Sequence, residues 1–281
     1  MDVGILHRGR LYRPQRTLRD RTRRRARGLR RNRRFRSHHL PGKARDPLPL
    51  YLTRPAALGG RYPLARAVTE RIRFICSIYL LALRHPVLAA KSVSTAAVMS
   101  QNRLILGVGA GWMREEFDLV GQPFEARGRR LDESIEVLRS LLRGGMVEHH
   151  GEFYDFDSIQ MSPVPDRALT IYGGGISNVA LRRAATLCDG WASEIQTTEE
   201  LDTILEKLRN YRAGSARADR PFGVCAALRD VFELDGYRAM AERGVTELIT
   251  VPWLFYGDAS QSCAQKCDGI RRFGDEVITQ I

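Results

Sequence analysis

Two glycine-rich segments are the parts of the sequence best suited to hold a ligand. The first belongs to an apolar run at residues 104–108 without a charged residue, which is typical of a strand buried on both faces in a parallel sheet. Gly107, Gly109 and Gly111 keep side chains away from the end of this strand, so a flat or phosphorylated group can approach its backbone closely. The spacing is GxGxG before Trp112, which differs from the GxGxxG of dinucleotide-binding loops and argues against that motif.

The second glycine-rich segment follows a predicted strand at residues 168–172. Three consecutive glycines lead directly into Ile176, Ser177 and Asn178, which open a helix with an apolar face. Free N–H groups and the positive end of the helix dipole both favour an anion, so this segment is a candidate phosphate cradle. A flexible turn without a ligand is the alternative, because glycine runs are also common in loops.

Both segments join a strand to a helix in a chain that alternates these two elements. A strand is predicted within residues 69–81, and Pro86 suits the first position of the next helix. The clearest helix spans residues 125–143, where apolar residues recur at helical spacing and two glycines follow the last turn. Residues 146–167 are predicted to form an irregular excursion of the kind that often covers a site.

The later part of the chain continues the alternation. Thr197 and Glu200 form a capping-box pattern for a helix through Tyr211, and Asp235 is placed to cap a further helix that ends at Gly244. A closing helix is expected to occupy residues 259–279. Strands are expected at residues 3–6, near residues 74, 106, 170, 191, 224 and 249, and between residues 29 and 37. Eight strands with helices between them predict an α/β fold of the TIM (β/α)8 type, in which the loops at the carboxyl ends of the strands carry the active site.

The positive charge of the chain is concentrated at its amino terminus. Residues 1–36 hold 15 arginines and two acidic residues, whereas the remainder has 30 basic and 30 acidic residues. The body of the chain is therefore not a nucleic-acid-binding surface by composition. Three interpretations of residues 8–36 compete: a disordered basic arm that neutralises phosphates, a solvated run without function, and a segment translated in the wrong reading frame.

Other features narrow the class of protein. No apolar run approaches the roughly 20 residues needed to cross a bilayer, and the amino terminus lacks the apolar centre of a secretory signal. We therefore expect a soluble, cytoplasmic protein without a membrane partner. The five cysteines are odd in number and scattered, which argues against a disulfide framework. Cys263 and Cys267 share a helix face without the further ligands of a zinc site, so no metal site is predicted.

Four motifs, in this order and at this spacing, resemble a known family. They are RLILGVGAGWMREEF at residues 103–117, RGRRLDE at 127–133, YGGGISNVALRRAA at 172–185 and CDGW at 188–191. Together they look like the bacterial luciferase-like monooxygenase family, above all its deazaflavin-dependent oxidoreductase branch. The resemblance covers about residues 37–281. It implies a TIM-type barrel that binds F420 (a deazaflavin) or FMN at the carboxyl ends of the strands and transfers two electrons between that cofactor and an organic substrate.

The resemblance also implies roles for individual residues. His39 matches a histidine near the reactive ring, where it would donate a proton or polarise a group; His38 recurs beside it in some members. Adjacent histidines on a loop are, however, also often solvated. Cys76, Ser77 and Ile78 fall where the family packs a non-prolyl cis peptide beneath the ring. The residues expected to line the pocket or to hold the cofactor phosphate are Gly107, Gly109, Gly173, Gly174, Gly175, Ile176 and Ser177.

One departure from the family lies upstream of His39. Family members have an amphipathic helix and an apolar strand where this chain has residues 8–36, so this region is anomalous, and two compensating frame shifts are the favoured explanation. We expect an Arg-rich segment at residues 1–36 and a luciferase-like barrel domain at residues 37–281. Loops at residues 43–68 and 146–167 would shape the substrate site.

The predicted function is a hydride transfer between F420 and a small organic substrate. An FMN-dependent monooxygenase of the same fold is the close alternative. A nucleic-acid-binding protein acting through residues 8–36 is a hypothesis from another class, although nucleic acid is not the expected partner; an inactive barrel is a third. The family inclines towards homodimers.

Overall fold

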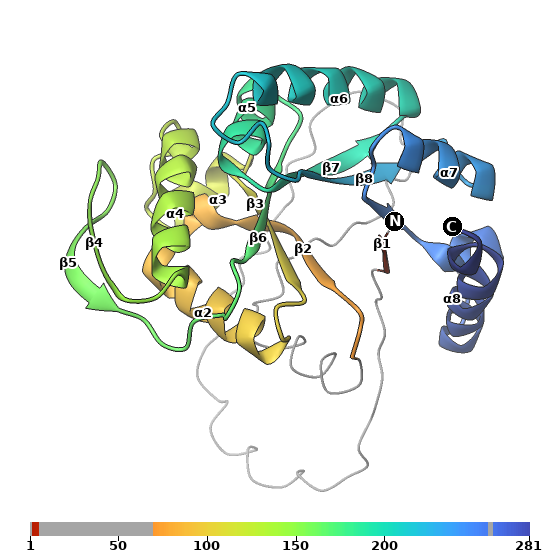
Figure 1. Cartoon of the computed structure of the whole chain (residues 1–281), viewed down its shortest axis with the longest axis horizontal. Helices are drawn as coiled ribbons and strands as arrows, with labels where there is room; N and C mark the ends of the chain where they lie inside the picture. Colours follow the sequence, from red (N-terminus) through yellow and green to blue (C-terminus); the bar gives the residue numbers. More distant parts are fainter. Residues whose placement is uncertain (1, 6–69, 258–260) are drawn as a thin grey trace, which may run out of the picture. The chain divides into compact units, whose positions relative to one another are not determined.

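The computed structural model describes residues 2–5, 70–257 and 261–281. Its main element is a seven-stranded sheet in the order β1-β9-β8-β7-β6-β3-β2, with every neighbouring pair parallel (Figure 1). The strands are β1 Asp2–Ile5, β2 Phe74–Leu80, β3 Leu104–Gly109, β6 Thr170–Gly174, β7 Gly190–Gln196, β8 Gly223–Leu228 and β9 Glu247–Thr250. Because β9 pairs with β1, the described strands follow the order of a TIM-type barrel, and the two edge strands among them, β1 and β2, are not paired with each other. The strand expected between residues 29 and 37, and the predicted division after residue 36, lie outside the described residues.

Helices follow the strands, as the alternation in the sequence predicts. The α-helices are α2 Pro86–Met99, α3 Arg114–Leu119, α4 Arg127–Leu142, α5 Asn178–Leu187, α6 Thr198–Ala213, α7 Leu234–Glu242 and α8 Cys263–Glu276. Short 3-10 turns occur at η1 Leu81–Leu83, η2 Pro252–Phe255 and η3 Ile278–Gln280. Among the described residues, no helix has both the length and the apolar character of a membrane span.

The side chains of the strands divide between two layers. Leu104, Leu106 and Val108 of β3 pack in a cluster with residues of α2 and α4, whereas Ile105 of the same strand packs with Tyr172 and other inward-facing side chains. All six residues of β3 are buried, which confirms the prediction of a strand covered on both faces. A second outer cluster joins β7, β8 and β9 to the helices α5 to α8.

The excursion at residues 146–167 is more regular than predicted. Its two halves, β4 Met146–His150 and β5 Asp155–Gln160, form an antiparallel hairpin that lies apart from the large sheet and next to α4 (Figure 1). Glu133 of α4 accepts hydrogen bonds from the backbone N–H groups of Phe153 and Tyr154 at 2.9 Å, and so fastens the turn of the hairpin. The prediction of an irregular segment was wrong because this anchor lies about 20 residues away in the sequence.

The ends of the helices were predicted with mixed success. Thr197 and Glu200 form the expected reciprocal capping box at α6, and Pro86 occupies the first turn of α2. Asp235 does not cap α7; it lies inside the first turn, and Glu233 precedes the helix without a side-chain cap. The short helix α3 was not predicted.

Candidate functional site

The carboxyl ends of β2, β3 and β6 meet around the side chain of Ile78. A Cβ atom placed on Gly107, Gly109 or Gly174 would lie 3.1, 2.8 or 2.6 Å from an Ile78 side-chain carbon. Cβ atoms essentially never approach as closely as at Gly109 and Gly174 and seldom as closely as at Gly107, so the absence of side chains at these three positions is what admits Ile78. We call Ile78 and these three glycines the Ile78 platform. The structure thus brings together predicted site residues from three separate strands.

The strand that carries Ile78 is irregular at this point. The Ser77–Ile78 peptide bond is cis, and the pairing of β2 with β3 shifts register between Cys76 and Tyr79. The carbonyl oxygen of Cys76 lies 2.6 Å from the position that a Cβ of Gly107 would take. The expected non-prolyl cis peptide is confirmed, whereas the cofactor contacts expected of Cys76, Ser77 and Ile78 stay predictions.

The second glycine-rich segment forms the β6–α5 connection at the same end of the sheet. Gly175 has a φ of +107°, which favours glycine, and its carbonyl accepts a 2.9 Å hydrogen bond from Trp191 Nε1. The Ser177 hydroxyl accepts a hydrogen bond from the N–H of Ala180 at 3.3 Å and caps α5 as predicted. Ile176 and Ser177 are exposed, so the amino end of α5 is accessible to an anion.

Gly173 faces away from the Ile78 platform, unlike Gly174. A Cβ at this position would lie 2.9 Å from Ala184 Cα and 3.3 Å from Cys188 Sγ, which places its missing side chain against α5 and the residue that follows it. Gly173 therefore permits close packing of α5 on β6, and only its backbone could contact a ligand at the rim. Two further predicted residues, His38 and His39, lie outside the described residues.

The loop after β3 contains a residue that the sequence analysis did not single out as functional. Trp112 follows Gly109 of the Ile78 platform by three residues, and 80% of its surface is exposed. The preceding Gly111 has a φ of +85° and rests on Phe117, since a Cβ there would lie 2.9 Å from the Phe117 ring. Arg127 Nε donates to the Gly111 carbonyl at 3.2 Å, so α3 and α4 both fix the loop that presents Trp112. A tryptophan directly after the glycine motif GVGAG is the sequence signal that could have identified it.

The RGRRLDE motif connects neighbouring segments through hydrogen bonds and an ion pair. Arg130 donates to the Ala82 carbonyl at 3.0 Å, and Asp132 forms an ion pair with Arg183 of α5. Glu133 anchors the β4–β5 hairpin. This motif therefore positions the loops around the site.

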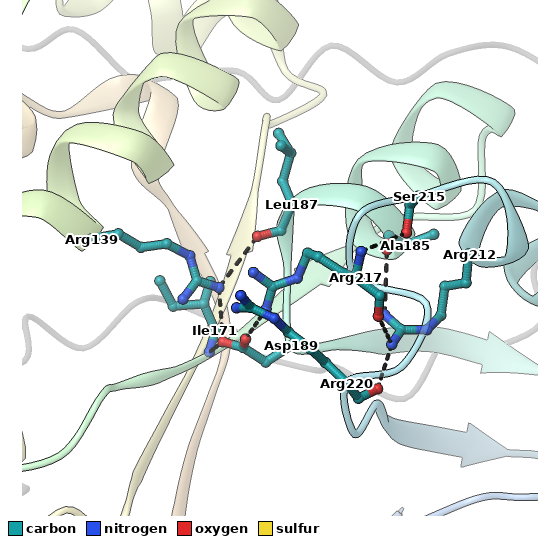
Figure 2. Close-up of polar contacts among 9 residues, drawn as sticks. All are labelled: Arg139, Ile171, Ala185, Leu187, Asp189, Arg212, Ser215, Arg217 and Arg220. Atoms are coloured by element: carbon teal, nitrogen blue, oxygen red, sulfur yellow. Dashed lines mark hydrogen bonds and ion pairs between the residues drawn. The ribbon is translucent and has the colours of Figure 1, made fainter.

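The CDGW motif acts at the opposite end of the strands. Asp189, just before β7, accepts hydrogen bonds from Ile171 N at 2.9 Å and from Arg139 Nη2 at 2.8 Å, and its other carboxylate oxygen pairs with Arg217 (Figure 2). Arg212 donates to the carbonyls of Arg217 and Arg220 at 2.6 and 2.5 Å. These contacts lie at the amino ends of the strands, the side of a TIM-type barrel that usually serves stability.

A hydrogen-bonded polar pair is buried in the interior between the strands. The Tyr172 hydroxyl donates to Glu247 at 2.9 Å, and both residues are 3% exposed. Burial, and then the charge of Glu247, raise the pKa of Tyr172 well above its usual range. Burial also raises the pKa of the neighbouring Cys225 thiol to about 12, so it is a neutral, unreactive group. Neither residue is available to a ligand at the rim.

Comparisons with known proteins agree with this arrangement. The sequence model of a family described as luciferase-like monooxygenase matches residues 64–253. An uncharacterized protein of Mycobacterium tuberculosis is 35% identical over 218 residues, which cover 76% of this chain and 75% of that protein. An FMNH(2)-dependent dimethylsulfone monooxygenase of Pseudomonas fluorescens is 29% identical over 152 residues, 53% of this chain and 42% of that protein.

A solved structure is similar over most of the chain. The coenzyme F420-dependent tetrahydromethanopterin reductase of Methanopyrus kandleri matches with a TM-score of 0.62 and 17% identity, covering 78% of this chain and 86% of that one. At this identity the likeness shows the fold alone.

Proposed function

Because the chain belongs to the luciferase-like monooxygenase family, we propose that it is an oxidoreductase that binds F420, or alternatively FMN, at the Ile78 platform and acts on a small organic substrate. Relatives that use each cofactor are known: the Pseudomonas fluorescens protein is named for FMNH(2), and the Methanopyrus kandleri protein for F420. F420 is our first choice because the motifs resemble the deazaflavin-dependent branch most.

The contact of Ile78 with three glycines from two strands is the observation that carries the proposal. It offers an apolar surface, bordered by backbone without side chains, at the end of the barrel where this fold places its active sites. A flat ring could lie on such a surface with little steric conflict. In this proposal Cys76 and Ser77 hold Ile78 in place, and the glycines of the platform line the pocket.

The amino end of α5 would hold the cofactor phosphate. Its exposed N–H groups and helix dipole favour negative charge, and Ser177 keeps the first turn in shape. Gly174 belongs to the platform and Gly175 lies in the loop that begins this helix, so one short segment serves both the ring and the phosphate. These residues suit such a cofactor: the glycines admit Ile78, which forms the apolar surface, and a capped helix end provides the donors.

The bound cofactor would supply hydride transfer in either case and, as FMN, also chemistry with oxygen. The protein's own contribution would be to orient the ring, to exclude water and to manage one proton. We assign the proton to His39, on the strength of the family resemblance.

Cofactor binding tests the proposal directly. The purified full chain is equilibrated with F420 or with FMN, passed through a desalting column, and its absorbance spectrum is recorded. We expect retention of F420 at about one equivalent per chain, and poorer retention of FMN. Retention of FMN alone would select the alternative, and retention of neither by a folded protein would refute both.

A further inference from the structure

The side chains around Asp189 carry an excess of positive charge over its single carboxylate. It consists of Asp189 and four arginines, Arg139, Arg212, Arg217 and Arg220, from α4, α6 and the segment between α6 and β8. We call this set the Asp189 cluster. In the view of Figure 2 the side chains of Arg139, Arg217 and Arg220 all point towards Asp189. One carboxylate therefore faces three guanidinium groups.

The contacts that the cluster makes leave several donors unused. Asp189 already accepts three hydrogen bonds, from Ile171, Arg139 and Arg217. The Nε atoms of Arg139 and Arg217 are buried and have no hydrogen-bond partner in the described part of the chain. Buried N–H groups without an acceptor are costly, so a movement of either side chain that brought its Nε to an external acceptor would be favoured.

Arg220 has the most freedom of the four. Its carbonyl accepts from Arg212, but across residues 70–257 and 261–281 its guanidinium makes no hydrogen bond or ion pair. By contrast, Arg212 directs both of its Nη atoms at backbone carbonyls. Arg220 can therefore turn to a ligand without breaking a contact.

The charges of the cluster repel one another. Burial, and then the positive charge of Arg217, lower the pKa of Arg212. Like charges at short range outside bulk water are stabilised when a multivalent anion lies between them. Guanidinium groups suit tetrahedral oxyanions because their donors are paired and planar.

The backbone that carries these arginines is held in place. The N–H of Arg217 donates to Ser215 Oγ at 3.2 Å, the N–H of Ser215 to the Arg212 carbonyl at 2.9 Å, and the N–H of Arg220 to the Arg217 carbonyl at 3.1 Å. Two consecutive turns thus set the spacing of Arg217 and Arg220. Little ordering would be needed on binding, which favours affinity.

We propose that the Asp189 cluster binds a small multivalent oxyanion, inorganic phosphate or the phosphate of a monoester, between Arg217 and Arg220 at the amino ends of the strands. This site is separate from the proposed cofactor phosphate site at α5, since the two lie at opposite ends of the parallel strands. The anion links the segment between α6 and β8 to the connection before β7 and stabilises the folded chain.

Thermal unfolding of the full chain tests this proposal. Melting temperatures are measured in chloride and in phosphate at equal ionic strength and pH, for the wild type and for Arg220→Gln. At a phosphate concentration tenfold above Kd, the wild type should gain about 2–4 °C, and Arg220→Gln should gain less than about 1 °C. Arg209→Gln is the matched control, because it removes the same charge from an exposed arginine of α6.

Two further comparisons make the outcome decisive. Ser177→Ala should keep the full rise in melting temperature with phosphate, because it alters only the amino end of α5, which lies at the carboxyl ends of the strands. Glycerol 3-phosphate in place of phosphate distinguishes the sources: equal shifts indicate recognition of the oxyanion alone, and a larger shift indicates a monoester site. The proposal is overturned if neither anion raises the melting temperature, if Arg220→Gln responds as the wild type does, or if Arg209→Gln loses the shift to the same extent as Arg220→Gln.

Discussion

The two ends of the parallel sheet are built in opposite ways. At the carboxyl ends of β2, β3 and β6, glycines and one isoleucine form an apolar surface, and the adjoining loops expose Trp112 and Ile176. At the amino ends, Asp189 and its arginines form a dense set of charged hydrogen bonds. The carboxyl end, here called the open end, is poor in polar contacts. The amino end, here called the tied end, is cross-linked by the hydrogen bonds and ion pairs of Asp189 to several elements.

This difference distinguishes residues that would contact a ligand from residues that stabilise the surrounding fold. The glycine motifs lie at the carboxyl ends of the strands, and the CDGW motif lies at their amino ends. Asp189 connects α4, β6 and the segment after α6 through three contacts. On the proposed function, a stable amino end lets the carboxyl end keep positions without side chains for a ligand.

The largest effect should come from breaking the tied end. Asp189→Asn removes the charge that pairs with Arg139 and Arg217, whose side chains are 20% and 15% exposed. We expect a loss of about 3 kcal/mol in the free energy of unfolding, because two largely buried cations would lose their partner. Urea denaturation measures this.

The control for that variant is Asp202→Asn. It breaks an ion pair with Arg243 in which both side chains are more than a third exposed, and it should cost less than about 1 kcal/mol. Equal losses in the two variants would show that the Asp189 cluster is no more important to stability than a surface pair.

A smaller effect is expected from filling the open end. Gly107→Ala adds a Cβ that would lie 2.6 Å from the Cys76 carbonyl oxygen, so β2 must shift away from β3. We expect a loss of about 1–3 kcal/mol in stability, and the displaced Ile78 should weaken cofactor binding at least about tenfold. Urea denaturation and equilibrium dialysis with F420 and FMN test the two parts.

Gly214→Ala provides the comparison for Gly107→Ala. Gly214 follows α6 with a φ of −93° and has no atom within 4 Å of its Cβ position, so alanine should change stability by no more than about 0.5 kcal/mol. If Gly107→Ala were as well tolerated as this variant, the close packing of β2 on β3 would be refuted.

The smallest effect on stability is expected from removing either of two helix N-caps at the carboxyl ends of the strands. Ser177→Ala and Thr197→Ala each remove a hydroxyl that accepts a backbone N–H, at 3.3 and 3.2 Å, and each should cost about 1 kcal/mol. Only Ser177→Ala should also reduce affinity for the cofactor, by about tenfold, because it disturbs the proposed phosphate site. Equal affinities in the two variants would place the phosphate elsewhere.

The fold was largely predictable because its signals are local. Apolar runs, glycines after strands, Pro86 and the capping box at Thr197 are each read within a few residues, and the helices and strands follow them. The glycines also indicated which ends of the strands would approach one another, because parallel strands with helical crossovers place their carboxyl ends together. The hairpin after α4 was missed, since its anchor, Glu133, lies outside the segment.

The sequence by itself determined where side chains had to be absent and where the helices α2 and α6 had to begin. Only the tertiary structure decided what fills or faces those positions: Ile78 beside Gly107 and Gly174, Ala184 against Gly173, and Arg139 and Arg217 on Asp189. The partners of Asp189 are 50 and 28 residues away from it along the chain. Spacing within a motif fixes local backbone geometry, whereas a contact between distant residues depends on how the strands and helices pack, which no short stretch of sequence specifies.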